Sequence, residues 1–203
     1  MKNIKPDNLI KLVFVVLLLV FVAGCVFFKI SSIDIGFHVK TGQLIVEGGK
    51  IPTKNTFSFT MPENPWLLHQ WLGAVLWYFA YFLGGVNGII ILRVLVFLLL
   101  TILLIKSMDL ISKDFFFLKL ALLTLFAVLV RQGFFARPFI FSALFLSLLQ
   151  YLVLRMRTHD KAKFFIPVLF IIWAHVHTGF IYGVVFLVAH LVGEAISLSL
   201  IHI

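Results

Sequence analysis

Seven apolar runs follow one another along the chain and constrain its fold more than any other feature. They lie near residues 9–28, 67–83, 88–105, 118–131, 138–154, 164–176 and 179–198. A helix needs about 20 apolar residues to cross the hydrocarbon core of a bilayer, with about 17 as a working lower limit. With 62% apolar and 12% charged residues, the chain also lacks the polar side chains that a water-exposed surface requires. We therefore predict an all-α, polytopic membrane protein.

Because several runs are close to the lower limit, the basic residues decide which runs cross the membrane. If 67–83 crosses, the basic clusters within 106–119 and 155–163 both lie on the outer side. If 67–83 lies along the outer surface instead, both clusters join the N-terminal lysines in the cytoplasm, as the positive-inside rule expects. This second arrangement predicts six spanning helices, cytoplasmic termini, and a large first outer loop over 29–87 with interfacial helices.

Two other classes of protein fit the sequence less well. A net charge of +9 can indicate nucleic-acid binding, but here the basic residues form short clusters between apolar runs, so we predict no nucleic-acid partner. The tetrapeptide at 22–25 fits a lipoprotein cleavage box that ends at Cys25, but the apolar run continues beyond it and more membrane segments follow. We therefore treat 1–203 as a single domain in the bacterial cytoplasmic membrane, surrounded by membrane lipids.

The predicted topology brings six polar residues from distant parts of the chain to the outer surface. Acidic, imidazole and guanidinium groups at the edge of a bilayer cost free energy unless they satisfy one another or are used for function. We therefore regard them as the candidate site: Asp34, His38, His69, Arg137, His175 and His177.

Asp34 and His38 are the strongest catalytic candidates in this group. A helix is expected from about Asp34 to Glu47, ending at Gly48-Gly49, so that the two side chains lie one turn apart on one face. A carboxylate there can accept a proton from a hydroxyl or bind a cation. Alternatively, Asp34 only stabilises the N-terminus of the helix through the helix dipole.

The other four candidates also have two interpretations each. His69 is either an interfacial polar residue or a ligand-binding one. Arg137 is either a snorkelling anchor or a clamp for a phosphate group, a task for which Arg131 competes. His175 and His177 either bind a metal ion or, as we favour, donate hydrogen bonds to an anionic ligand. The sequence contains no motif for a redox cofactor.

Three segments carry a resemblance to a known family. "IDIGFHVKTGQLIVEGGKIPTKNTFSFTMPENPWLLHQWL" resembles the first outer loop of bacterial GT-C type membrane glycosyltransferases, which use polyprenyl-phosphate sugars. "ARPFIFSALFLSLLQYLVLR" and "FIIWAHVHTGF" resemble two later segments of that family, in the same order. The resemblance implies transfer of a sugar from a polyprenyl-phosphate carrier to an acceptor on the outer face of the membrane.

The resemblance also implies roles for particular residues. Asp34 matches the family's first-loop aspartate, which acts as the base on the acceptor or helps to hold a metal. His38, His69 and His177 fall on its histidine positions, and Arg137 matches its arginine before proline. On this basis we expect Asp34, oriented by His38, to deprotonate the acceptor.

Other positions depart from the family pattern. Ser32 stands in place of an acid, Phe37 in place of Trp, Gln70 in place of Glu, His175 in place of Asn and Thr178 in place of Gly. Without the two acids we expect at most weak binding of a divalent metal. The chain is also shorter than such enzymes, so we expect an N-terminal or minimal module. The alternative function is a non-catalytic membrane protein that binds a lipid or scaffolds a partner.

Overall fold

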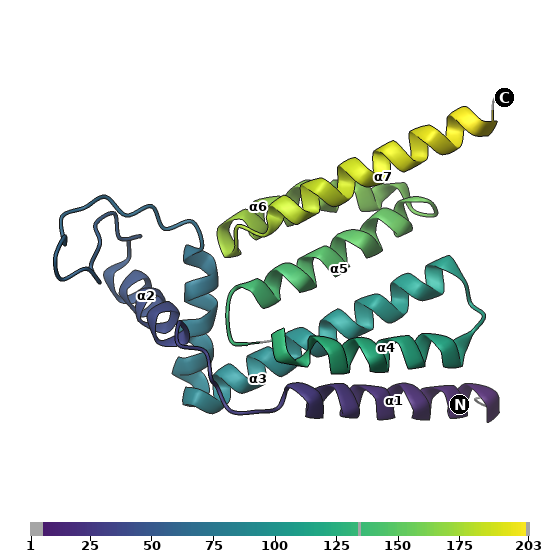
Figure 1. Cartoon of the computed structure of the whole chain (residues 1–203), viewed down its shortest axis with the longest axis horizontal. Coiled ribbons are helices and arrows are strands. Elements are labelled where there is room, and N and C mark those ends of the chain that lie inside the picture. Colours follow the sequence, from purple (N-terminus) through teal and green to yellow (C-terminus); the bar gives the residue numbers. More distant parts are fainter. Residues whose placement is uncertain (1–5, 134, 202–203) are drawn as a thin grey trace.

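The computed structural model describes residues 6–133 and 135–201, and its architecture is entirely helical, as predicted (Figure 1). Two short 3₁₀ helices, at Arg131–Gly133 and Asp160–Phe164, lie between longer elements. The described residues form seven α-helices: α1 (Pro6–Val26), α2 (Ile35–Gly48), α3 (Trp71–Ile111), α4 (Phe116–Val130), α5 (Phe139–Met156), α6 (Phe165–Val176) and α7 (Phe180–Ile201).

Four of these helices, α1, α3, α5 and α7, are long and apolar enough to cross a membrane. Helix α4 has 15 residues and α6 has 12, so both are shorter than a full span. Helix α1, the later part of α3, and α4 to α7 pack into one bundle (Figure 1). The chain is therefore a multi-pass membrane protein, built from at least these four apolar helices.

Helix α3 bends sharply at Gly84 and Gly85. Gly85 has φ 57° and ψ −140°, a backbone conformation that glycine adopts without steric cost and other residues avoid. The part before the bend, residues 71–83, lies across one end of the bundle beside α2, whereas the part after it runs along the bundle (Figure 1). The sequence predicted a separate helix within 67–83, and the structure has one that begins at Trp71 and ends at the bend.

Helix α2 packs closely against the part of α3 that precedes the bend. A Cβ atom on Gly42 would lie 2.2 Å from the backbone oxygen of Ala74, so only glycine allows this approach. Gly73 is similarly close to α6, because a Cβ atom there would lie 2.5 Å from the backbone oxygen of Val176. Helix α2 and residues 71–83 are thereby held against the end of the bundle.

The two ends of the bundle have different compositions. One end carries α2, residues 71–83, the α4–α5 connection and the short α6–α7 connection (Figure 1). The other end carries the start of α1 and the basic α3–α4 and α5–α6 connections (Figure 1). All six candidate residues belong to the first end, which we call the site end.

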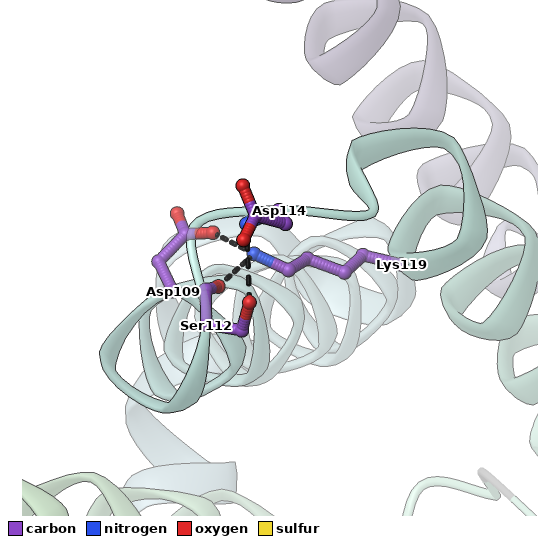
Figure 2. A network of polar contacts seen from close by, with 4 residues as sticks. All are labelled: Asp109, Ser112, Asp114 and Lys119. Atoms are coloured by element: carbon purple, nitrogen blue, oxygen red, sulfur yellow. Dashed lines mark hydrogen bonds and ion pairs between the residues drawn. The ribbon is translucent and has the colours of Figure 1, made fainter.

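A polar network closes the α3–α4 connection at the opposite end (Figure 2). Lys119 Nζ lies 2.6 Å from a carboxylate oxygen of Asp109 and donates to the backbone carbonyl of Ser112. The backbone N–H of Asp114 donates to Ser112 Oγ at 3.1 Å. The next residue, Phe115, has φ 58°, so these bonds help to fix a turn that a non-glycine residue adopts only at a cost. Lys119 therefore has a structural role.

Candidate active site

An ion pair between Asp34 and Arg137 lies at the centre of the site end. Arg137 Nη2 is 2.9 Å from Asp34 Oδ2, and Arg137 Nε donates to Ser32 Oγ at 3.3 Å. Both side chains of the ion pair remain about half exposed, at 50% for Arg137 and 51% for Asp34. The pair therefore joins the start of α5 to the start of α2 while staying open to a ligand.

The position of Asp34 bears on its alternative role as a helix-stabilising residue. Asp34 is the N-cap residue of α2, with φ −81° and ψ −11°. Within the described residues, however, its side chain makes no capping hydrogen bond and contacts Arg137 instead. The helix ends as predicted, at Gly48 followed by Gly49 with φ 63°. The carboxylate is therefore directed at the site rather than at the helix backbone.

A cavity of about 420 Å³ opens beside this ion pair. It combines one acid, one guanidinium, two imidazoles and an amide with an apolar wall. Its lining consists of Asp34, His38, Gln70, Gly133, Phe135, Arg137, Pro138, Phe139 and His177. Four of the six residues predicted from the sequence thus come together, from segments more than a hundred positions apart.

His177 is held by a chain of hydrogen bonds behind the cavity. Its Nδ1 accepts the backbone N–H of Gly179 at 3.0 Å and lies 2.8 Å from Ser142 Oγ. Ser142 Oγ in turn accepts the indole N–H of Trp173 at 2.8 Å. Because Nδ1 accepts, the neutral ring carries its proton on Nε2, which leaves that N–H for a partner in the cavity. A Cβ atom on Gly179 would lie 2.3 Å from Ser142 Oγ, so glycine is required there.

Both histidines of the cavity are held in their neutral form. Burial lowers the pKa of His38 below its usual 6.5; Asp34 opposes this effect, and His177 and Arg137 add to it. Burial likewise lowers the pKa of His177. At neutral pH both rings are therefore uncharged, and Arg137 is the cation that faces Asp34.

His69 and His175 lie outside this cavity. His175 is exposed, and its Nδ1 accepts the indole N–H of Trp71 at 3.1 Å. His69 is also exposed, in the segment before α3. His175 and His177 therefore do not face a common ligand, and residues 6–133 and 135–201 contain no group of three His, Cys, Asp or Glu side chains placed to hold a metal ion.

Arg93 is a residue of the site end that the sequence analysis did not single out. It is fully buried in α3, where its guanidinium donates to the backbone carbonyl of Phe28 and stacks 4.0 Å above the Phe28 ring. Arg93 thus anchors the segment that leads from α1 to Asp34. The sequence could have pointed to Arg93, because it is a lone charge inside an apolar run, where charged residues are costly.

No family model, curated protein or solved structure matches this chain. The fold and its apolar helices define the class to which it belongs, that of multi-pass α-helical membrane proteins. Only the residues of the site itself therefore indicate its chemistry.

Proposed function

We propose that the protein is an inverting glycosyltransferase of GT-C type, which moves a sugar from a polyprenyl-phosphate carrier to an acceptor on the outer face of the membrane. The observation that carries this proposal is the Asp34–Arg137 ion pair at 2.9 Å, beside a cavity with two neutral histidines. A carboxylate and a guanidinium side by side provide a proton acceptor and a phosphate-binding group within one site.

In the proposed reaction, Asp34 accepts the proton of the acceptor hydroxyl. The acceptor oxygen then forms a bond to the anomeric carbon, and the bond from that carbon to the phosphate oxygen breaks. The electron pair of the broken bond stays with the carrier phosphate, whose added charge is stabilised by Arg137 and by the Nε2–H of His177. Attack opposite the leaving group inverts the anomeric centre.

His38 serves as a positioning residue in this mechanism. It is only 7% exposed, it lies one helical turn after Asp34, and it interacts electrostatically with Asp34, Arg137 and His177. A buried neutral ring one turn from the carboxylate adds no second positive charge to a base that already faces Arg137. Its replacement should therefore have a milder effect than loss of the carboxylate.

Asp34→Asn tests the central role of the carboxylate. Because the ion pair is half exposed, its loss should change stability by about 0.2–1 kcal/mol at most. Loss of a general base should lower the rate of sugar transfer by about 10²–10⁴-fold. Glu63→Gln is a matched control, since it removes an exposed acid paired with Lys54 in the same outer loop. Near-normal transfer by Asp34→Asn, beside an active wild type, would refute the mechanism.

We also propose that six helices cross the membrane, with the site end outside. Helices α4 and α6 are short, but both lie within the bundle, and the basic connections lie at the opposite end (Figure 1). After Cys25→Ser, single cysteines at 54 and 86 should react with an impermeant reagent added to intact cells, and cysteines at 113 and 160 should not. Outside labelling of 113 would contradict this topology.

A non-catalytic lipid-binding protein is the second candidate. Ser32 and Gln70 stand where the resembling family has acids, and here Ser32 only accepts a hydrogen bond from Arg137. Such a protein would bind a polyprenyl phosphate through Arg137 and transfer nothing. Binding of polyprenyl phosphate by purified wild type that shows no transfer from a range of polyprenyl-phosphate sugars would favour this candidate.

A further inference from the structure

A second, larger cavity of about 790 Å³ lies beside the bend of α3. We call it the groove. Its walls come from the segment between α1 and α2, from one face of α2, and from α3 around the bend. Its lining includes Val39 on α2 and Ile89 and Ile90 on α3, so part of its wall is apolar. A cavity of this volume is large enough for a drug-sized ligand.

The charges on the groove have a single sign. Lys29 and Lys40 both line it and are both exposed, and its described lining includes no Asp or Glu. Lys40 Nζ donates to Gln43 Oε1 at 3.0 Å, which keeps the ammonium over the groove. An apolar groove with positive charges at its rim is complementary to an amphiphile with an anionic headgroup.

The groove is connected to the candidate active site through Ser32. Ser32 lines the groove and accepts a hydrogen bond from Arg137, which lines the cavity that contains Asp34. Ser32 thus lies both in the wall of the groove and beside the Arg137 side chain that pairs with Asp34. Since Arg137 and His177 already account for the carrier phosphate, the groove remains for the other substrate.

We propose that the groove binds the acceptor, and that the acceptor is an amphiphile with an anionic headgroup rather than a water-soluble sugar. Its apolar chain lies along Val39, Ile89 and Ile90, and its anionic group lies between Lys29 and Lys40. A headgroup hydroxyl then reaches Asp34. This assignment of the acceptor rests on the proposed function, whereas the binding of an anionic amphiphile can be tested without it.

The binding experiment uses the full chain in nanodiscs of neutral lipid, with phosphatidylglycerol as the probe and native mass spectrometry as the readout. Lys29→Gln/Lys40→Gln should weaken retention of the probe on the order of thirtyfold, because each lysine near a lipid headgroup contributes a few-fold to tenfold. Lys50→Gln/Lys54→Gln removes the same charge from another part of the outer loop and should have little effect. Val39→Trp should fill the groove and also reduce retention.

Equal losses in the two double variants would mean that only surface charge attracts the probe, and the groove proposal would fail. In the transfer assay, Lys29→Gln/Lys40→Gln should raise the KM for a lipid-anchored acceptor and leave the KM for the donor unchanged. A raised donor KM would show that the groove holds the carrier, which would overturn the assignment. The proposed function would fail if the wild type transferred no sugar and Arg137→Gln left polyprenyl-phosphate binding unchanged. The phosphatidylglycerol experiment would still decide whether the groove binds anionic amphiphiles.

Discussion

Replacing Ser142 with alanine should destabilise the protein through a single unpaired hydrogen-bond donor. Ser142 is 3% exposed, and its Oγ accepts the N–H of Trp173, a side chain with no exposed surface. Without that oxygen the indole N–H stays buried and unpaired, at a cost of about 1–3 kcal/mol. For a chain of this length, each kcal/mol lowers the melting temperature by roughly 2–4 °C, so we expect a fall of about 2–12 °C.

The assay is thermal unfolding of the purified protein in detergent, with a second serine as the matched control. Ser147 lies on the same helix and is also buried, but its hydroxyl donates only to the backbone oxygen of Ala143 in its own helix. Ser147→Ala therefore leaves no donor unpaired and should change the melting temperature much less. Trp173→Phe removes the donor, so Ser142→Ala should cost little when added to it.

The double-mutant cycle decides between this explanation and a simple loss of packing. A coupling free energy of about 1 kcal/mol or more between Ser142→Ala and Trp173→Phe is expected if the N–H···O bond carries the effect. Additive effects, or a loss in Ser147→Ala as large as in Ser142→Ala, would refute the reasoning.

Two further predictions concern the packing of α2 and the charge state of the cavity. Gly42→Ala should lower the free energy of unfolding by about 1–3 kcal/mol, because the new Cβ atom meets the Ala74 carbonyl. Gly36→Ala, whose Cβ atom would have nothing within 4 Å, should raise the free energy of unfolding by about 0.5–1 kcal/mol. A melting temperature lowered equally by both variants would contradict this. Because the pKa values of His38 and His177 are lowered, their contribution to stability is fully present above their usual 6.5 and is lost as pH falls through the lowered values. Replacement of both by glutamine should flatten this acid-side fall in melting temperature, and an unchanged profile would show that other groups cause it.

The sequence predicted that Asp34 and Arg137 lie at the same surface, but not that they pair with each other. The distribution of basic residues placed both at one end of the bundle, and their opposite charges made a contact there favourable. The participation of Ser32 was not expected, because a hydroxyl in a loop carries no specific signal. The carboxylate was expected to have either a helix-stabilising or a chemical role, and in the described part of the structure it makes no bond to the helix backbone and pairs with Arg137.

His175 and His177 lie in different environments because helix α6 ends between them. Helix α6 ends at Val176, so His175 lies in its last turn and contacts Trp71. His177 has an extended backbone, with φ −162° and ψ 144°, and this brings its ring to the cavity. Two residues two positions apart lie on different faces of a helix, but sequence patterns do not define helix ends to one residue, so the place of each ring could not be predicted.

The bend of α3 could be predicted from the sequence, whereas the contact that Arg93 makes could not. Two adjacent glycines between an aromatic segment and an apolar one indicate a break, and the structure has it at Gly84 and Gly85. Arg93 instead donates to the carbonyl of Phe28, and every residue has a carbonyl. When a side chain donates to a backbone carbonyl, the sequence contains no pattern that identifies which carbonyl it is.

The Asp34–Arg137 contact also has a consequence for the biosynthesis of the protein. Arg137 follows Asp34 by about a hundred residues, and His177 follows later still. During ribosomal synthesis, α2 is therefore made well before the segment that carries the arginine with which Asp34 pairs. Until α6 has been synthesised as well, the nascent chain has no Trp173 to donate to Ser142. Chain elongation thus delays completion of the site until most of the bundle has been synthesised, and an intermediate stalled before Arg137 would leave the acid unpaired.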